Sequence, residues 1–258
     1  MGTVARVLAL IEVLGVHPEG MPVIKLAQVM RLPPSSTHRL LSLLREQGYV
    51  LQDVNTKLYS LSLKMFRFAA RLLDSLDLRR VSSTHMQRLA ELTGLNPLLT
   101  VYDRSQQEAI CVDTIGGGGQ IKFFVGLGKV MPLHCAATGK AVAAFLPKAE
   151  RERLFENRVL ERFTKRTCTD RGRLREEWKR IRKQGYAVCD EEMEMGVAAV
   201  GAPVWDSSGQ VIGSIGVLGV KQAFESRDGK RIPLLVVAAS KEISRTLGGS
   251  ETIQVEED

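Results

Sequence analysis

Residues 23–46 read VIKLAQVMRLPPSSTHRLLSLLRE, and this stretch decides the fold of the N-terminal part of the chain. Apolar side chains recur at helical spacing before the Pro33-Pro34 break, and leucines recur at helical spacing after it. We therefore expect two short helices joined by a tight turn. A helix-turn-helix of this kind places the start of its second helix in the major groove of DNA.

The second helix begins with a run of side chains that form hydrogen bonds. These are Ser35, Ser36, Thr37, His38 and Arg39. Hydroxyls and free amides at a helix start bind phosphates, and an arginine can donate two hydrogen bonds to a guanine. We interpret this segment as a DNA-recognition helix. The alternative is that the serines only cap a helix with Pro34 near its first position, an arrangement common in globular proteins.

Two short β-rich runs follow at residues 49–51 and 57–61, separated by the polar residues 53–56. They predict a hairpin, and a helix-turn-helix followed by a hairpin is a winged helix. Lys57 lies at the tip of this wing, where it could contact a phosphate or the minor groove. An apolar stripe over residues 4–14 predicts the third helix that completes such a domain.

Charge is distributed unevenly along the 258 residues, of which 44% are hydrophobic and 25% charged. Residues 1–73 hold nine basic and four acidic side chains, so they carry +5 of the total formal charge of +7. A basic first part joined to a larger, nearly neutral part indicates a polyanionic partner at one end of the chain. The length is sufficient for two ordinary domains.

Several protein classes are disfavoured by the sequence. The apolar run at 4–14 is interrupted by Arg6 and Glu12, so we expect neither a signal peptide nor a membrane partner, and we expect a cytoplasmic protein. The four cysteines are far apart with no CxxC pair, so we expect no disulfide and no bound metal. No cofactor is expected, because Gly139-Lys140 and the glycine run 116–119 lack the rest of a phosphate-binding loop.

The rest of the chain is predicted from the periodicity of its apolar residues. Helices are expected over 62–76 and 77–93 with a break at 75–77, and the first of them has an apolar face wide enough to pack against a second copy of the chain. Strands are expected at 98–102, 108–115, 121–125, 186–188, 197–205 and 210–220. Further helices are expected at 136–146 and 231–247, and the basic stretch 148–184 is expected to form two charged helices. The predicted domains are 1–62, a linker helix 63–76, a larger domain 77–250 and an acidic tail 251–258.

The order and spacing of several segments resemble the IclR (isocitrate lyase regulator) family of bacterial transcription factors over nearly the whole length. The segments are LPPSSTHRLL at 32–41, GYV at 48–50, YSL at 59–61, HCAATGKA at 134–141, GYAVCDEEMEMG at 185–196 and APV at 202–204. The resemblance implies an α+β protein with an N-terminal winged helix and a C-terminal GAF/profilin-like antiparallel sheet domain with flanking helices. It also implies a regulator that binds double-stranded operator DNA, binds a small effector, often a carboxylate, and forms homodimers or homotetramers.

The chain departs from the family pattern at several positions. Family members usually have Gly where Arg31 stands and often Lys where Pro34 stands. Family effector pockets often present polar groups near Ala199, Gly216 and Leu218, where this chain has small or apolar residues. A more apolar effector than the small keto-acids of the family at large is therefore expected.

We expect the effector between the helix start at 134–140 and the hairpin at 189–218. The candidate residues are Phe123, Leu127, His134, Cys135, Ala136, Ala137, Cys189, Asp190, Ala199, Gly216 and Leu218. The amides of Ala136 and Ala137 would bind a carboxylate, and Gly216 would leave volume for a ring or an alkyl chain. The sequence leaves open which effector binds and whether DNA binding represses or activates transcription.

Two other functions could use residues 134–135 and 189–191. An enzyme could use His134 as base and Cys135 as nucleophile, oriented by Asp190 or Glu191, but adjacent residues rarely face each other in that way, so we expect no enzyme. A thiol- or metal-responsive regulator using Cys135, Cys189 and His134 remains the alternative.

Overall fold

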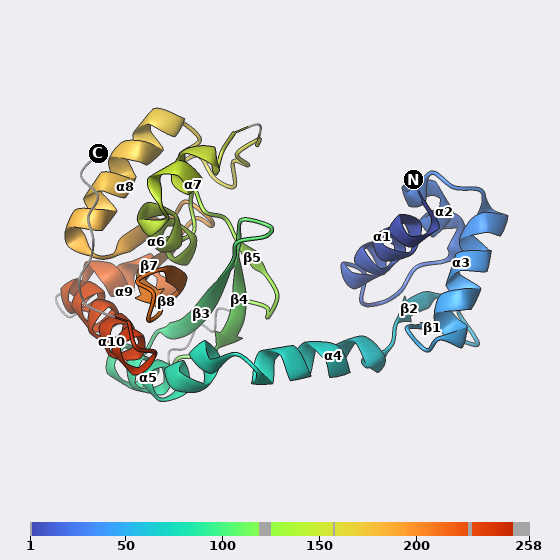
Figure 1. The fold of residues 1–258 in the computed structure, drawn as a ribbon, viewed down its shortest axis with the longest axis horizontal. Helices are drawn as coiled ribbons and strands as arrows, with labels where there is room; N and C mark the ends of the chain where they lie inside the picture. Colours follow the sequence, from blue (N-terminus) through green and yellow to red (C-terminus); the bar gives the residue numbers. More distant parts are fainter. Residues whose placement is uncertain (1, 119–124, 157, 227–228, 250–258) are drawn as a thin grey trace. The chain divides into compact units, whose positions relative to one another are not determined.

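The computed structural model describes residues 2–118, 125–156, 158–226 and 229–249 (Figure 1). It divides into two compact units, Met1–Ser75 and Leu76–Asp258, which are described separately below. The division coincides with the predicted break between two helices. None of the helices in the described ranges is both long and apolar enough to cross a membrane.

The first unit is a winged helix followed by one more helix. Its elements are α1 (Thr3–Gly15), α2 (Val23–Met30), α3 (Pro34–Glu46), β1 (Val50–Gln52), β2 (Tyr59–Leu61) and α4 (Leu63–Asp74), with β1 and β2 antiparallel. Leu10, Leu26 and Leu41 are buried together in its core. Arg31 ends α2 in the left-handed conformation with φ 52°, which glycine adopts at lower cost.

The second unit is a six-stranded antiparallel sheet with helices on its faces. The strands are β3 (Asn96–Asp103), β4 (Glu108–Thr114), β5 (Val130–Met131), β6 (Ala187–Asp190), β7 (Val197–Trp205) and β8 (Val211–Val220), in the order β5-β4-β3-β8-β7-β6. The helices are α5 (Asp77–Thr93), α6 (Ala137–Phe145), α7 (Lys148–Arg153), α8 (Arg171–Gln184), α9 (Lys221–Glu225), the 3₁₀ turn Gly229–Arg231 and α10 (Ile232–Thr246). The α+β class is thus confirmed. The strand expected at 121–125 lies largely outside the described residues.

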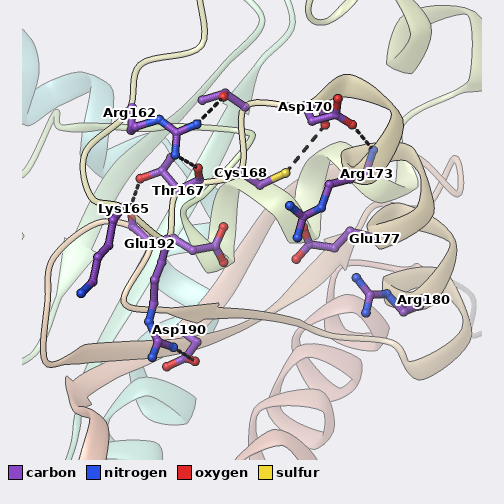
Figure 2. A pocket seen from close by; sticks show the side chains of 12 residues that line it. Arg162, Lys165, Thr167, Cys168, Asp170, Arg173, Glu177, Arg180, Asp190 and Glu192 are labelled. Carbon is purple, nitrogen blue, oxygen red and sulfur yellow. Dashed lines mark hydrogen bonds and ion pairs between the residues drawn. The ribbon is translucent and has the colours of Figure 1, made fainter.

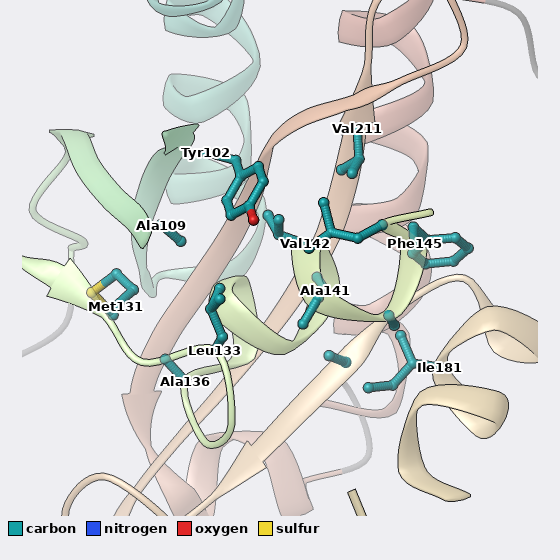
Figure 3. Close-up of a cluster of buried hydrophobic side chains, with 14 of the residues drawn as sticks. Tyr102, Ala109, Met131, Leu133, Ala136, Ala141, Val142, Phe145, Ile181 and Val211 are labelled. Carbon is teal, nitrogen blue, oxygen red and sulfur yellow. The ribbon is translucent and has the colours of Figure 1, made fainter. Parts of the chain in front are cut away.

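Helices cover both faces of this sheet, with α5 and α10 on one side and α6 on the other (Figure 1). The main apolar core fills the space between the sheet, α6 and α8 (Figure 3). Val142 and Phe145 of α6 and Ile181 of α8 are part of it. Apolar residues at helical spacing on α6 and α8 supply this contact, which fixes α6 against the strands.

The start of α6 packs directly on the backbone of two strands. A Cβ at Gly201 would lie 2.8 Å from the Thr138 nitrogen, and one at Gly216 would lie 2.5 Å from the Val200 carbonyl oxygen and 2.9 Å from Thr138 Cγ2. The expectation that Gly216 leaves volume for an effector is therefore wrong. The glycine is needed because helix and strand already occupy that space.

A buried ion pair connects α6 with two other segments. The Lys140 side chain is 0% exposed, its Nζ lies 2.7 Å from Glu177 Oε1 on α8, and it also donates to Glu192 in the segment between β6 and β7. Burial alone would lower the pKa of Lys140, but the two carboxylates outweigh it and hold that pKa above its ordinary value. Lys140 is therefore a charged residue that holds three parts of the fold together.

Lys140→Met should destabilise the protein by about 3–5 kcal/mol in urea unfolding at pH 8, because two carboxylates lose their cation. Burial already raises the pKa of Glu192, so the Glu192 carboxyl stays protonated to a higher pH in the folded protein than in the unfolded chain. Protonation of Glu192 therefore stabilises the folded protein more as the pH falls. The destabilisation caused by Lys140→Met should be smaller at pH 5 than at pH 8.

The matched control adds Glu177→Gln and Glu192→Gln to Lys140→Met. This triple variant buries no full charge at the three positions and should recover most of the lost stability. Equal stability of Lys140→Met and the natural protein at pH 8 would show that the ion pair does not support the fold.

Candidate DNA-binding and effector-binding sites

The start of α3 presents part of the predicted recognition surface. Ser35, His38 and Arg39 are exposed, and Ser36 is half-buried. Thr37 is fully buried, and its hydroxyl donates to the Pro33 carbonyl oxygen at 3.2 Å. Thr37 is therefore a core residue that stabilises the first turn of the helix, in contrast to its predicted contact with DNA.

The wing is closed by hydrogen bonds around one carboxylate. Asp53 accepts from the backbone nitrogens of Thr56 at 2.7 Å and Asn55 at 3.0 Å. The backbone and side-chain bonds from Thr56, with that from Asn55, hold the pKa of Asp53 below its ordinary value. Lys57 follows with φ 59° and an exposed side chain. The wing therefore presents a cation beside a rigid turn.

The second unit contains a cavity of about 220 Å³ between the start of α6 and the sheet. Five of the predicted effector residues line it. They are Ala136, Ala137, Cys189, Ala199 and Leu218. The structure adds Leu98, Val125, Lys129, Met131, Thr138, Met193, Glu194 and Val197. The predicted location is thus a real cavity, although the set of lining residues differs.

Other predicted effector residues lie elsewhere. Leu127 is exposed and does not line the cavity. Asp190 is outside it as well, because its carboxylate pairs with Arg166 at 2.8 Å and Lys221 at 2.7 Å. Gly216 is excluded by the packing described above. Phe123 lies outside the described residues.

His134 and Cys135 also have structural partners. The His134 Nε2 lies 2.9 Å from the Glu161 carbonyl oxygen, and its ring stacks on Phe163. Burial lowers the pKa of His134, so the imidazole stays neutral. The Cys135 thiol contacts the Met193 sulfur at 3.2 Å. Neither residue lines the cavity.

The thiols lack the chemistry of a sensor. Burial raises the pKa of Cys135 and of Cys189, so both stay protonated at neutral pH, whereas a reactive or metal-binding cysteine needs its thiolate. Within the described ranges, no group of three or more His, Cys, Asp or Glu residues could hold a metal ion. The burial of Cys135 and Cys189 therefore disfavours a reactive thiol at either position.

The first turn of α6 contributes polar groups to the lining of the cavity. Thr138 is 2% exposed, and its Oγ1 has no hydrogen-bond partner among the described residues. The Ala136 nitrogen, predicted as a donor to the effector, instead donates to the Pro132 carbonyl oxygen at 3.0 Å. The Ala137 and Thr138 nitrogens have no backbone acceptor in the described part of the chain. Free donors thus remain at the helix start, one residue later than predicted.

Comparison with known proteins places this fold and these sites in context. Residues 70–245 match the profile described as "Bacterial transcriptional regulator IclR C-terminal", and residues 3–54 match "IclR helix-turn-helix domain". The regulator KipR of Bacillus subtilis is 29% identical, with 95% of this chain and 97% of KipR covered. The transcriptional repressor IclR of Escherichia coli is 26% identical, with 96% and 90% covered.

Solved structures of the same kind resemble the chain over its length. The IclR of Thermotoga maritima has a TM-score of 0.75 and 26% identity, with 95% of this chain and 98% of that one covered. An IclR homolog from Microbacterium hydrocarbonoxydans, complexed with 4-hydroxybenzoate, shares the fold with a TM-score of 0.81 and 20% identity, with 95% and 99% covered.

Proposed function

The chain belongs to the IclR family of DNA-binding transcriptional regulators, which are not enzymes, and we propose that an apolar carboxylate controls its binding to operator DNA. The observation that carries this proposal is the unpaired, buried hydroxyl of Thr138 at the polar end of the cavity. A buried hydroxyl without a partner costs about 1–3 kcal/mol, which a bound acceptor would recover.

A carboxylate is the acceptor that suits this end of the cavity. It would accept from Thr138 Oγ1 and from the free amides of Ala137 and Thr138, and its charge would be favoured by the helix N-terminus. Two charged residues also line the cavity, Lys129, which would attract an anion, and Glu194, which would repel one. The proposed anchor therefore combines side-chain and backbone donors.

The other end of the cavity favours an apolar body. Leu98, Met131, Val197, Ala199 and Leu218 line it, and each CH₂ group buried against them would add about 0.8 kcal/mol. A hydroxyl-rich ligand would leave its own polar groups unpaired there. The 4-hydroxybenzoate in the M. hydrocarbonoxydans homolog combines a carboxylate with a ring. We therefore propose aromatic or medium-chain carboxylates for this chain.

Thermal-shift measurements should show stabilisation by benzoate or octanoate and little by glyoxylate or pyruvate. Thr138→Val should weaken the shift while leaving the protein folded, because it removes one donor of the anchor and breaks no hydrogen bond of the described residues. Thr138→Ser is the matched control and should retain the shift. The proposal is wrong if the small keto-acids stabilise the protein and the aromatic acids do not.

We propose that α3 and the wing bind DNA through Ser35, Ser36, His38, Arg39 and Lys57. The serines would contact phosphates, while His38 and Arg39 extend from the exposed side of the helix. E. coli IclR is named a repressor, and we propose repression as the outcome here too. Such a protein would act in the cytoplasm, where the operator is.

Arg39→Ala should weaken binding to the operator by about 1–3 kcal/mol and relax the sequence preference at one position of each half-site, because a base contact is lost. Lys57→Ala should weaken binding to operator and to random DNA equally, since it contacts phosphate. Lys241→Ala, an exposed cation of the second unit, is the control. Titration of both DNAs at fixed salt distinguishes these effects, and equal losses for Arg39→Ala would identify a phosphate contact instead.

We also propose that the free protein is at least a dimer, joined through α1 and α4. Exposed apolar side chains lie on both helices. Leu8 is exposed on α1, and Phe66 and Leu72 of α4 are each 65% exposed. Faces of this kind are normally covered by a partner, and many helix-turn-helix proteins read two half-sites as dimers. A second copy of the chain is the proposed cover.

Light scattering at micromolar concentration should return at least twice the chain mass of 28.5 kDa. Phe66→Asp combined with Leu72→Asp should lower the mass, because two charges would be buried in the interface. Val159→Asp, a change at a side chain exposed in the second unit, should leave the mass unchanged. A mass near that of one chain for the natural protein would contradict the dimer.

A further inference from the structure

A second, larger pocket lies next to the segment 189–194, and the proposed function does not use it. It has a volume of about 670 Å³ and opens between the loop at 162–170 and the helix α8 (Figure 2). That volume lies within the range of small-molecule sites. Its wall is polar and charged. The cavity beside α6, which residues 189–194 also line, is mostly apolar.

The acidic residues of this pocket are already occupied. Asp170 caps α8 by accepting from the Arg173 backbone nitrogen at 2.7 Å. Asp190 pairs with Arg166. Glu177 and Glu192 both bind the buried Lys140. Each of these carboxylates therefore has another partner, and none of them forms an ion pair with Lys165, Arg173 or Arg180 in the described ranges.

Three cations of the pocket have no hydrogen bond or ion pair through their side chains within the described ranges. They are Lys165, Arg173 and Arg180. Lys165 belongs to the loop, and Arg173 and Arg180 approach from α8 on the opposite side (Figure 2). Arg162 is held in place, because it donates to the Thr167 carbonyl oxygen and to Thr169 Oγ1. Three cations without a direct ion pair thus line one concave site.

We propose that this pocket binds a small phosphorylated metabolite. Three like charges around a common space repel one another, and an anion placed between them removes that repulsion. A phosphate ester carries about −1.5 to −2 at pH 7 and accepts the paired hydrogen bonds that an arginine donates. The pocket is also larger than an inorganic ion needs, so the site has room for the organic part of the molecule.

The chain contains its own reporter for this site. Cys168 lines the pocket and is half-exposed, whereas Cys111, Cys135 and Cys189 are buried. Alkylation by iodoacetamide should therefore modify Cys168 first. Pyrophosphate can also bind the basic DNA-binding unit, and a signal that arises at Cys168 separates the two locations.

The test is the rate of Cys168 alkylation in the full chain, with inorganic pyrophosphate as the probe at 0.15 M salt. A ligand at about ten times its Kd should slow the reaction about tenfold. The triple variant Lys165→Gln, Arg173→Gln, Arg180→Gln should lose this protection. The matched control Arg171→Gln, Lys183→Gln, Lys241→Gln removes three exposed cations outside the pocket and should keep it.

Three results would overturn the proposal. They are no protection in the natural protein, equal protection in the two triple variants, and protection by citrate as strong as that by pyrophosphate. The last result would reject the phosphate assignment. None of these outcomes depends on whether a carboxylate binds beside Thr138, because the probe, the variants and the thiol all belong to the second pocket.

Discussion

The second unit depends on one buried charge, the Lys140 ammonium inside α6. Removing an ammonium group from water costs desolvation free energy. Glu177 of α8 and Glu192 of the segment after β6 offset this cost because both bind the ammonium. Three separate stretches of chain must therefore be in place at once. The α6 helix cannot slide or rotate without breaking this arrangement, so the donors at its first turn hold a fixed position above the sheet.

Much of the fold could be predicted because the relevant signals are local. The breaks at Pro33-Pro34 and at residues 75–77 are marked by residue type. The helix α2 ends and α3 begins within a few residues of the first break, and α4 ends and α5 begins at the second. The wing and the strands after Gly94 follow from alternation and turn residues in the same way. Residues near in sequence determine these features, so the sequence carries them directly.

The sequence points to the segments that border the cavity beside α6 but only to part of its lining, for a physical reason. Leu98, Met131 and Thr138 come together only when β3, β5 and α6 are assembled, and no local pattern reports that. Gly216 looked like free volume, whereas it marks a close contact between backbones. Thr37 looked like a DNA contact because its neighbours are polar, yet helical geometry turns it into the core. The hydroxyl of Thr138 at a helix start is a local feature of the sequence that points to the polar part of this cavity.

The short stretch from Cys189 to Glu194 is a partition one chain thick. Cys189 and Met193 face the apolar cavity, while Asp190 and Glu192 face the charged pocket. The same residues form a wall of both sites, so a displacement of this stretch that enlarges one site would narrow the other. If filling one compartment shifts this stretch, the two occupants would by thermodynamic reciprocity change each other's affinity by the same factor. A regulator built in this way would compare two metabolites, and its output would depend on both.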